Sequence, residues 1–471
     1  MLFNTFQFAY FFALLLPIYW MLPHKPQNWL LLAASYYFYS CWDPRFLALL
    51  VLSTAMDYAC GLAVDKIESP RPRKLFVALS MALNLGMLGY FKYFNFFADS
   101  LQTLLARGGL HVPLSHLNVV LPIGISFYTF QSMSYVIDVY RREIKPTRNF
   151  IDFAAFVSFF PHLVAGPIMR PTTLLPQIAS KRKFDLQQFY HGSYLIFWGL
   201  TKKVVVADNL ALIVNDLFGR WQSIDGGLAL LAVYAFAFQI YCDFSGYTDA
   251  ARGIAKCMGI ELSLNFNLPY FATSPRDFWA RWHISLSTWL RDYLYITLGG
   301  SRGSKLATYR NLMLTMVIGG LWHGANWTFV AWGFYQGLLL VAHRLLEPWL
   351  KKLEPADRIE HACWTGLRIF VTFHLVCLGW LLFRAGSIQQ AYGMLSAIVN
   401  HPAIPASSYI LPVALAILPL LVVQLVQYLS QDLDVILRTP WYVRSAFYTL
   451  CFYAFVLAGE FGGSQFIYFQ F

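Results

Sequence analysis

Long, uninterrupted apolar runs separated by short polar segments dominate the chain. A transmembrane helix needs about 20 consecutive apolar residues, and continuous runs favour helices over the alternating pattern of a membrane barrel. The sequence therefore predicts an all-α, multi-span membrane protein. The runs that we interpret as spans cover residues 2–22, 28–42, 46–64, 75–97, 118–139, 187–206, 227–245, 365–383, 408–428 and 445–460.

Two further apolar stretches do not fit a single straight span. Two prolines and a glycine interrupt residues 149–169, and a crossing there would place the positive cluster Lys181–Lys183 outside. We therefore predict a re-entrant element, whose non-helical backbone must be covered by protein or a cavity. Residues 311–342 are too long for one span and have Lys and Arg residues on both sides. Because positive segments stay in the cytoplasm, we predict a helical hairpin or a re-entrant pair there, with its apex near residues 324–326. The total is then about 10–12 crossings.

Loop charges predict the orientation. Lys and Arg cluster in the loops at 66–74 and 141–148, whereas the segment near 98–117 carries only Arg107 as a fixed positive charge. The first two loops are therefore expected in the cytoplasm, and the third segment and the N-terminus outside. The first residues lack the basic region of a cleavable signal, so the first apolar run is predicted to be a retained span.

Composition excludes a soluble globular protein, a disordered chain and a fibrous repeat. Of 471 residues, 58% are hydrophobic and 13% are charged, against about 25% charged in soluble proteins. The net charge of +11 comes from 35 basic and 24 acidic residues, which fits cytoplasmic loops and membrane lipid rather than nucleic acid. Seven cysteines form no CxxC pair, so we expect neither a disulfide framework nor a metal centre. We predict one membrane-embedded domain over residues 1–471.

The longest polar-rich stretch, residues 241–310, holds the first candidate chemistry. A capping serine followed by proline predicts a helix over about 275–294. Arg276, His283 and Ser287 share one stripe of this helix. The stripe either faces a polar cavity or lies at the membrane interface with His283 solvated.

A second histidine, His323, lies next to Trp322 inside an apolar segment. An ionisable residue there indicates a functional site by default, and the alternative is a neutral histidine bonded to a neighbouring helix. Asn326 follows closely enough to orient His323 or a substrate carbonyl. Two Gly-x-x-x-Gly pairs, at 320–324 and 333–337, either allow close helix packing or thin the wall for a passing substrate.

A buried imidazole suits acyl transfer from a thioester. The thioester is already activated, so the main requirement is removal of a proton from the attacking hydroxyl. Histidine has an ordinary pKa of about 6.5, and burial keeps it neutral and basic. An Asn side chain, a Trp indole such as that of Trp322, or backbone N–H groups are suited to hold the developing oxyanion. Asp243, in a polar break after a long apolar run, is a weaker candidate for substrate binding.

Several blocks of sequence are similar to those of one enzyme family. They are Leu121–Tyr128, Phe160–Pro167, Tyr241–Asp249, Asn265–Tyr270, Ser274–His283, Trp322–Trp327 and Phe466–Phe471. Together they resemble the membrane-bound O-acyltransferases, in the bacterial branch of alginate O-acetylase-like proteins. The resemblance covers nearly the whole chain.

This resemblance implies a helical membrane enzyme with a tunnel between its two faces and a catalytic core segment over residues 241–345. His323 is then the principal catalytic residue and His283 the second family histidine. The implied donor is cytoplasmic acetyl-CoA, a substrate rather than a permanently bound cofactor. Arg276 and Arg281 are predicted to meet the CoA phosphates, with lipid headgroups as the alternative partner.

In this branch the implied function is O-acetylation of a polysaccharide hydroxyl, as in alginate, cellulose or peptidoglycan, from the bacterial inner membrane. The implied protein partner is a periplasmic acetyltransferase of the SGNH-hydrolase or alginate-acetylation type. A relative uses a carrier-protein thioester for D-alanylation of teichoic acid. The competing interpretations are a polytopic transporter or flippase, a membrane glycosyltransferase, and a non-catalytic subunit of a polysaccharide export complex.

Overall fold

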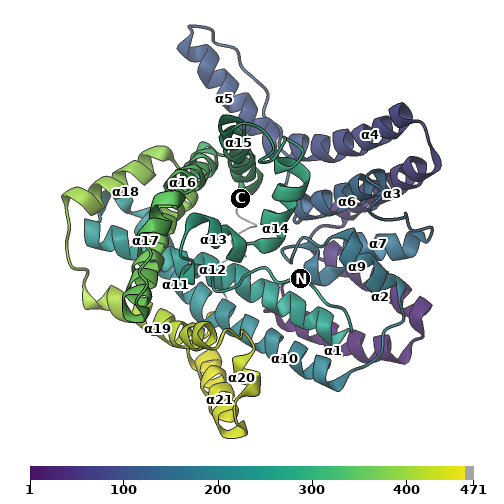
Figure 1. The fold of residues 1–471 in the computed structure, drawn as a ribbon. Coiled ribbons are helices and arrows are strands. Elements are labelled where there is room, and N and C mark those ends of the chain that lie inside the picture. Colours follow the sequence, from purple (N-terminus) through teal and green to yellow (C-terminus); the bar gives the residue numbers. More distant parts are fainter. Residues whose placement is uncertain (462–471) are drawn as a thin grey trace. The chain divides into compact units, whose positions relative to one another are not determined.

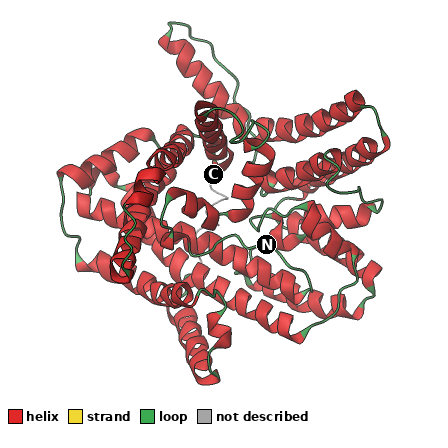
Figure 2. Cartoon of the chain, in the orientation of Figure 1, coloured by secondary structure: helices red, strands yellow, loops and turns green. Residues whose placement is uncertain are grey.

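The structure is a computed structural model that describes residues 1–461, and every regular element in that range is a helix (Figures 1 and 2). The predicted all-α fold is thereby confirmed. Two compact units are formed by residues 1–197 with 248–263, and by residues 198–247 with the chain from 264 onward. The helices α10 (Leu186–Thr201) and α12 (Gly226–Cys257) each contribute to both units. The single-domain interpretation stays a prediction.

The first unit contains the N-terminal helices. They are α1 (Phe6–Met21), α2 (His24–Ser40), α3 (Pro44–Lys66), α4 (Pro70–Leu88), the short π-helix Gly89–Tyr93, α5 (Phe94–Arg107), α6 (Ile125–Tyr140), α7 (Phe150–Ser158), α8 (Phe160–Leu163) and α9 (Pro171–Ala179). The stretch predicted to be re-entrant, residues 149–169, contains the two short helices α7 and α8. Each of them is too short to cross a bilayer. Their side chains are almost entirely buried in protein, as broken backbone at membrane depth requires.

The second unit contains the C-terminal helices and the candidate chemistry. Its elements are the short π-helix Lys202–Ala207, α11 (Asp208–Gly219), the 3₁₀ turns Trp221–Ser223 and Pro269–Phe271, α13 (Pro275–Arg281), α14 (Ile284–Trp289), the short π-helix Leu290–Tyr295, α15 (Lys305–His323), α16 (Trp327–Lys352), α17 (Arg358–Arg384), α18 (Ile388–Asn400), α19 (Ser407–Ser430), α20 (Val435–Arg438) and α21 (Trp441–Ala458).

Six helical segments among residues 1–461 are long and apolar enough to cross a membrane. They are Pro44–Lys66, Pro70–Arg107, Gly226–Cys257, Trp327–Lys352, Arg358–Arg384 and Ser407–Ser430. The multi-span character predicted from the sequence is confirmed, whereas the larger total of about 10–12 crossings, which counts shorter elements, stays a prediction. The central tunnel also stays a prediction.

Two expected boundaries are wrong. The span predicted over 118–139 is helical only from Ile125, because Gly124 adopts a left-handed backbone with φ of 75° and stops the helix from extending backward. The segment predicted as an external loop, 98–117, is still helical to Arg107. The C-terminal block Phe466–Phe471 lies outside the described residues.

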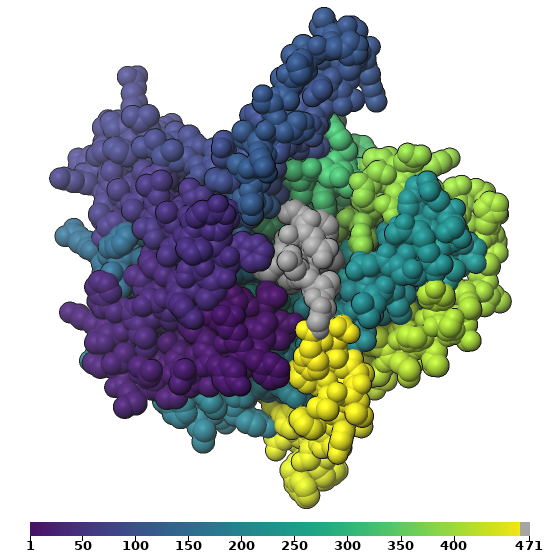
Figure 3. All heavy atoms as spheres, turned by 180° about the vertical axis from the view of Figure 1, so that it is seen from behind, coloured from purple at the N-terminus to yellow at the C-terminus, as the bar shows by residue number. Residues whose placement is uncertain are grey.

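Large apolar side chains on the surface fit a lipid environment. The helix α21, drawn in yellow in Figure 3, has no buried side chain along its length. Trp441, Leu450, Phe452 and Leu457 are among its exposed residues. Such a continuous apolar surface would aggregate in water and is stable against hydrocarbon.

Candidate functional site

The two halves of residues 311–342 form the hairpin that the charges on both sides predict. The helix α15 ends at His323, and α16 begins at Trp327 after a three-residue turn. Asn326 caps α16, because its Oδ1 accepts the backbone N–H of Thr328 at 3.0 Å. Its Nδ2 faces the carbonyl of Gly386 at 3.4 Å. Both polar ends of Asn326 therefore have structural partners, and its predicted contact with substrate stays a prediction.

Glycines bring the two helices of the hairpin into backbone contact. A Cβ on Gly320 would lie 2.3 Å from the carbonyl oxygen of Phe329, and one on Gly333 would lie 2.4 Å from that of Met316. No side chain fits at such distances. The structure thus favours close packing as the role of these glycines over a thinned wall for substrate passage.

The continuous amphipathic helix predicted over 275–294 is wrong. The helix α13 ends at Arg281, His283 takes a left-handed backbone conformation with φ of 43°, and α14 starts at Ile284. Arg276 and His283 therefore do not share one helical stripe. The break turns the imidazole of His283 into the protein, where the side chain is completely buried rather than solvated.

Asn265 is the physical reason for this break. Its Oδ1 accepts the backbone N–H of Ser285 at 3.1 Å and the Ser285 hydroxyl at 2.8 Å. Its carbonyl accepts the N–H of Ile284 at 3.0 Å. These bonds replace the helical bonds that residues 281–285 would otherwise make. Sequence reasoning noted Asn265 only within a similar block and gave it no role.

The same Asn265 oxygen fixes the tautomer of His283. It lies 3.3 Å from His283 Nδ1 and already accepts bonds from Ser285, so the atom is an acceptor and Nδ1 carries the proton. Nε2 of His283 then holds the basic lone pair. Burial lowers the pKa of His283 to about 3, so the ring is neutral at physiological pH.

The structure brings together the two histidines that the sequence singled out. The ring centroids of His283 and His323 are 6.4 Å apart. The indole of Trp322 lies beside both, 6.2 Å from His283 and 5.1 Å from His323. Because both imidazoles are buried, the pair forms a candidate centre for moving a proton in a water-poor site.

Aromatic rings enclose this histidine pair. Phe244 packs edge-on against His283 at 4.7 Å. Trp332 and Phe383 pack edge-on against His323 at 5.1 and 5.4 Å. These rings come from α12, α16 and α17, so three helices hold the pair in a low-dielectric environment in which a neutral imidazole is favoured.

Asp243 lies next to Phe244 on α12 and forms part of a buried ion cluster. Lys203 Nζ is 2.7 Å from Asp243 and 2.7 Å from Asp208. Burial raises the pKa of Asp208 to about 7. Sequence reasoning did not single out Lys203 or Asp208, because the contact joins Lys203 to carboxylates on two different helices, which sequence spacing does not predict. The structure shows a lysine partner for Asp243, and its predicted contact with substrate stays a prediction.

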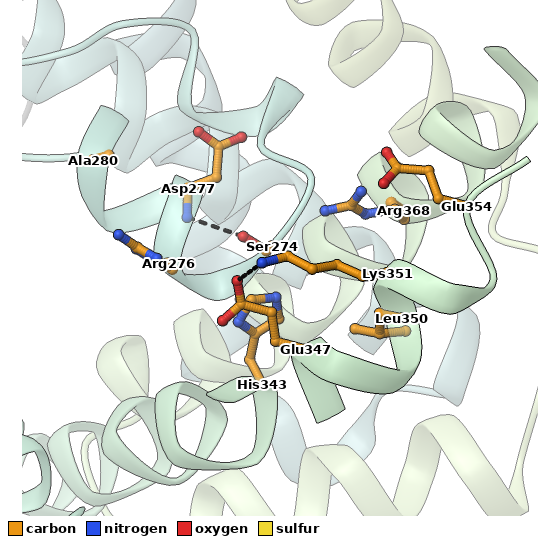
Figure 4. A pocket seen from close by; sticks show the side chains of 10 residues that line it. All are labelled: Ser274, Arg276, Asp277, Ala280, His343, Glu347, Leu350, Lys351, Glu354 and Arg368. Atoms are coloured by element: carbon orange, nitrogen blue, oxygen red, sulfur yellow. Dashed lines mark hydrogen bonds and ion pairs between the residues drawn. The ribbon is translucent and has the colours of Figure 1, made fainter. Parts of the chain in front are cut away.

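A polar pocket of about 350 Å³ lies where α13 meets the C-terminal end of α16 and the N-terminal part of α17 (Figure 4). Its lining residues are Ser274, Arg276, Asp277, Ala280, His343, Glu347, Leu350, Lys351, Glu354 and Arg368. Of the two arginines predicted to meet CoA phosphates, only Arg276 lines it. Arg281 instead bonds Asp277 at 2.7 Å along α13.

Comparison with known proteins matches this chain to one enzyme family and to named relatives. The model of the membrane-bound O-acyltransferase family matches residues 130–383, a range that holds both histidines. The chain is 44% identical over 398 residues to a probable alginate O-acetylase of Azotobacter vinelandii, covering 84% of this chain and 77% of the relative.

Two relatives that are named for other activities are also similar. The peptidoglycan O-acetyltransferase of Helicobacter pylori is 35% identical over 433 residues, covering 85% of this chain and 80% of the relative. The teichoic acid D-alanyltransferase of Bacillus subtilis is 31% identical over 281 residues, covering 56% of this chain and 69% of the relative.

Proposed function

Because this chain belongs to the membrane-bound O-acyltransferase family and is therefore an acyltransferase, we propose that it transfers an acetyl group from acetyl-CoA toward a hydroxyl of a cell-surface polysaccharide. The observation that carries this proposal is the pair of buried imidazoles, His283 and His323, with ring centroids 6.4 Å apart. The activities for which the alginate and peptidoglycan relatives are named support an acetyl group and a polysaccharide acceptor.

In the proposed reaction, His323 takes the proton from the acceptor hydroxyl as the oxygen attacks the thioester carbonyl. The new C–O bond forms, the C–S bond breaks, and the proton passes to the departing CoA thiolate. His283 relays that proton through Nε2, since Nδ1 is held by Asn265. The aromatic enclosure excludes water that would hydrolyse the thioester.

The pocket beside α13 is the proposed entrance for the nucleotide end of acetyl-CoA. Arg276, Lys351 and Arg368 supply positive charge there, beside three carboxylates of the same lining, and guanidinium and ammonium groups bind phosphates. Arg368 is held in place because it donates to the carbonyl of Thr273 at 3.1 Å. Lys351 forms an ion pair with Glu347 at 3.0 Å. Arg276 is exposed and has no ion pair among the described residues. Arg276 is therefore the cation most available to a ligand.

A periplasmic acetyltransferase of the SGNH-hydrolase or alginate-acetylation type is the proposed partner, in the bacterial inner membrane. In this arrangement the membrane enzyme delivers the acetyl group across the bilayer, and the partner places it on the polymer. This division is supported by the six helical segments among residues 1–461 that are long and apolar enough to cross a membrane.

The test is to incubate the protein in proteoliposomes with radiolabelled acetyl-CoA, with and without such a partner and its polysaccharide. Replacing His323 by Ala should lower acetyl transfer by about 10²–10⁴-fold, the usual contribution of a general base. His401→Ala, a change of an exposed histidine outside the site, should leave the rate unchanged. Full activity of His323→Ala would contradict the assignment of His323.

The chemical outcome distinguishes the competing functions. Label that becomes covalently attached to polymer or partner supports acetyl transfer. Label that crosses the bilayer while still attached to CoA would indicate a transporter. Transfer of a D-alanyl group, but not of acetyl, would replace the proposed donor with an aminoacyl thioester.

A further inference from the structure

Two buried hydrogen-bond donors of α16 are not used by the reaction described above. Trp332 and Gln336 are four residues apart and therefore lie on one face of the helix. Each side chain is only 1% exposed. In the part of the chain that the structure describes, neither Trp332 Nε1 nor Gln336 Nε2 has a hydrogen-bond acceptor.

Both donor nitrogens lie close to the same residue of the neighbouring helix α17. A Cβ built on Gly379 would lie 2.6 Å from Gln336 Nε2 and 3.5 Å from Trp332 Nε1. Any residue larger than glycine would push the amide of Gln336 aside. Gly379 therefore allows the amide of Gln336 to pack directly against the backbone of α17.

Leaving two such donors without acceptors is unfavourable. A buried N–H that loses its water without gaining an acceptor carries an uncompensated desolvation cost, and this cost is larger inside a membrane span. Both residues lie within the apolar helix Trp327–Lys352. Unpaired polar groups of this kind are expected where a ligand supplies the missing acceptor.

The donors also lie next to the candidate catalytic base. The indole of Trp332 that carries one donor packs edge-on against the ring of His323, with centroids 5.1 Å apart and planes at 90°. One of the two donors is therefore carried by a ring that directly contacts the candidate base.

We propose that Trp332 Nε1 and Gln336 Nε2 form a two-donor binding site for the carbonyl oxygen of the acyl group. This inference rests on the proposed function. As the acceptor hydroxyl attacks, the carbonyl oxygen gains negative charge, and two preorganised N–H donors stabilise that charge more strongly than the neutral carbonyl. The acyl carbonyl, which only accepts hydrogen bonds, matches a site that only donates them.

The variants that test the site remove one donor each and preserve shape. Gln336→Met keeps a long, flexible side chain without N–H groups, and Trp332→Phe keeps an aromatic ring against His323. Tyr335→Phe is the matched control: it lies on the same helix and loses a hydrogen bond to the carbonyl of Leu375 (2.9 Å) but no donor of the site. All are compared in proteoliposomes with radiolabelled acetyl-CoA, with thermal unfolding as the check on folding.

We expect Gln336→Met and Trp332→Phe each to lower kcat by about 10²-fold, as loss of one oxyanion donor does in other enzymes. KM for acetyl-CoA should change far less, and Tyr335→Phe should keep the parental kcat. If the parent protein transfers acetyl and both variants retain its kcat, the two-donor site is wrong while the proposed function stands. If the parent transfers no acetyl at all, the proposed function fails first.

A spectroscopic readout separates carbonyl binding from a purely structural role. Acetonyl-CoA, a ketone analogue that cannot transfer its acyl group, is labelled with ¹³C at its carbonyl and bound to the protein. Two donors should shift the infrared carbonyl stretch to lower frequency, and Gln336→Met should reverse part of that shift. An unshifted carbonyl in the parent protein would overturn the proposal. Retained kcat in Gln336→Glu would do so as well, since it would indicate that residue 336 accepts a bond from Trp332 instead.

Discussion

Single residues set the chemistry of the histidine pair, and Asn265 shows how. One amide oxygen satisfies the backbone and hydroxyl of Ser285 and faces Nδ1 of His283. It therefore determines both the backbone conformation and the tautomer of a residue 18 positions away in sequence. The basic nitrogen of His283 is directed away from Asn265 for the same reason.

Replacing Asn265 by Ala should accordingly damage both stability and activity. The buried N–H of Ser285 would lose its acceptor, which costs about 1–3 kcal/mol, and His283 would lose the partner that fixes its proton. We expect a lower midpoint of thermal unfolding in detergent. We also expect the rate of acetyl transfer to fall as far as it does when His283 itself is replaced by Ala. The control is Ser285→Ala, which removes only the hydroxyl bond and keeps the N–H bond. Equal behaviour of the two variants would contradict a special role for Asn265.

At the scale of elements, the sequence predicted the hairpin well and the segment before it poorly. The positive charges on both sides of residues 311–342 and the polar turn near 324–326 are local signals, and the structure has α15 and α16 as expected. The break at His283 has no local signal, because residues 275–294 have an amphipathic helical pattern. Its cause is a bond to Asn265, and hydrogen bonds between distant segments override local helical periodicity.

The hairpin yields a prediction of its own, since its packing depends on glycine. Gly333→Ala places a methyl group 2.4 Å from the carbonyl oxygen of Met316. The resulting displacement should destabilise the protein by about 1–3 kcal/mol, the usual cost of overpacking. Gly366→Ala in α17 is the matched control, because a Cβ there meets nothing within 4 Å.

Both substitutions gain the same helix propensity, about 1 kcal/mol relative to glycine. The difference between their unfolding midpoints therefore isolates the contact between α15 and α16. We expect Gly366→Ala to match or exceed the parent and Gly333→Ala to unfold earlier. A Gly333→Ala protein as stable as Gly366→Ala would show that the two helices are not held at the distance seen here.

At the scale of the whole molecule, composition and hydropathy were enough for the fold class, and short similar blocks were enough for the family. The donors Trp332 and Gln336 were beyond sequence reasoning. Tryptophan and glutamine in an apolar helix have many uses, and only the structure shows that both donors lie beside Gly379 of another helix without an acceptor among the described residues. The Lys203 cluster was missed for the same reason, since its two carboxylates come from different helices.

The orientation in the membrane gives the last prediction, because the proposed donor, acetyl-CoA, is a cytoplasmic metabolite and its proposed pocket has to face that side. Cys363 lies near the start of α17, a few residues after the pocket residue Glu354, and is exposed. Cys41 is also exposed. It follows the C-terminal end of α2, and the loop charges place this end of the helix on the outer side.

Two single-cysteine proteins, each retaining one of these residues and checked for parental acetyl transfer, are treated with a membrane-impermeant maleimide. In intact spheroplasts only the Cys41 protein should react, and in inverted vesicles only the Cys363 protein. Reaction of Cys363 from outside would place Arg276 and Lys351 in a compartment without acetyl-CoA, and the proposed entrance would have to be abandoned even if the histidine pair proved catalytic.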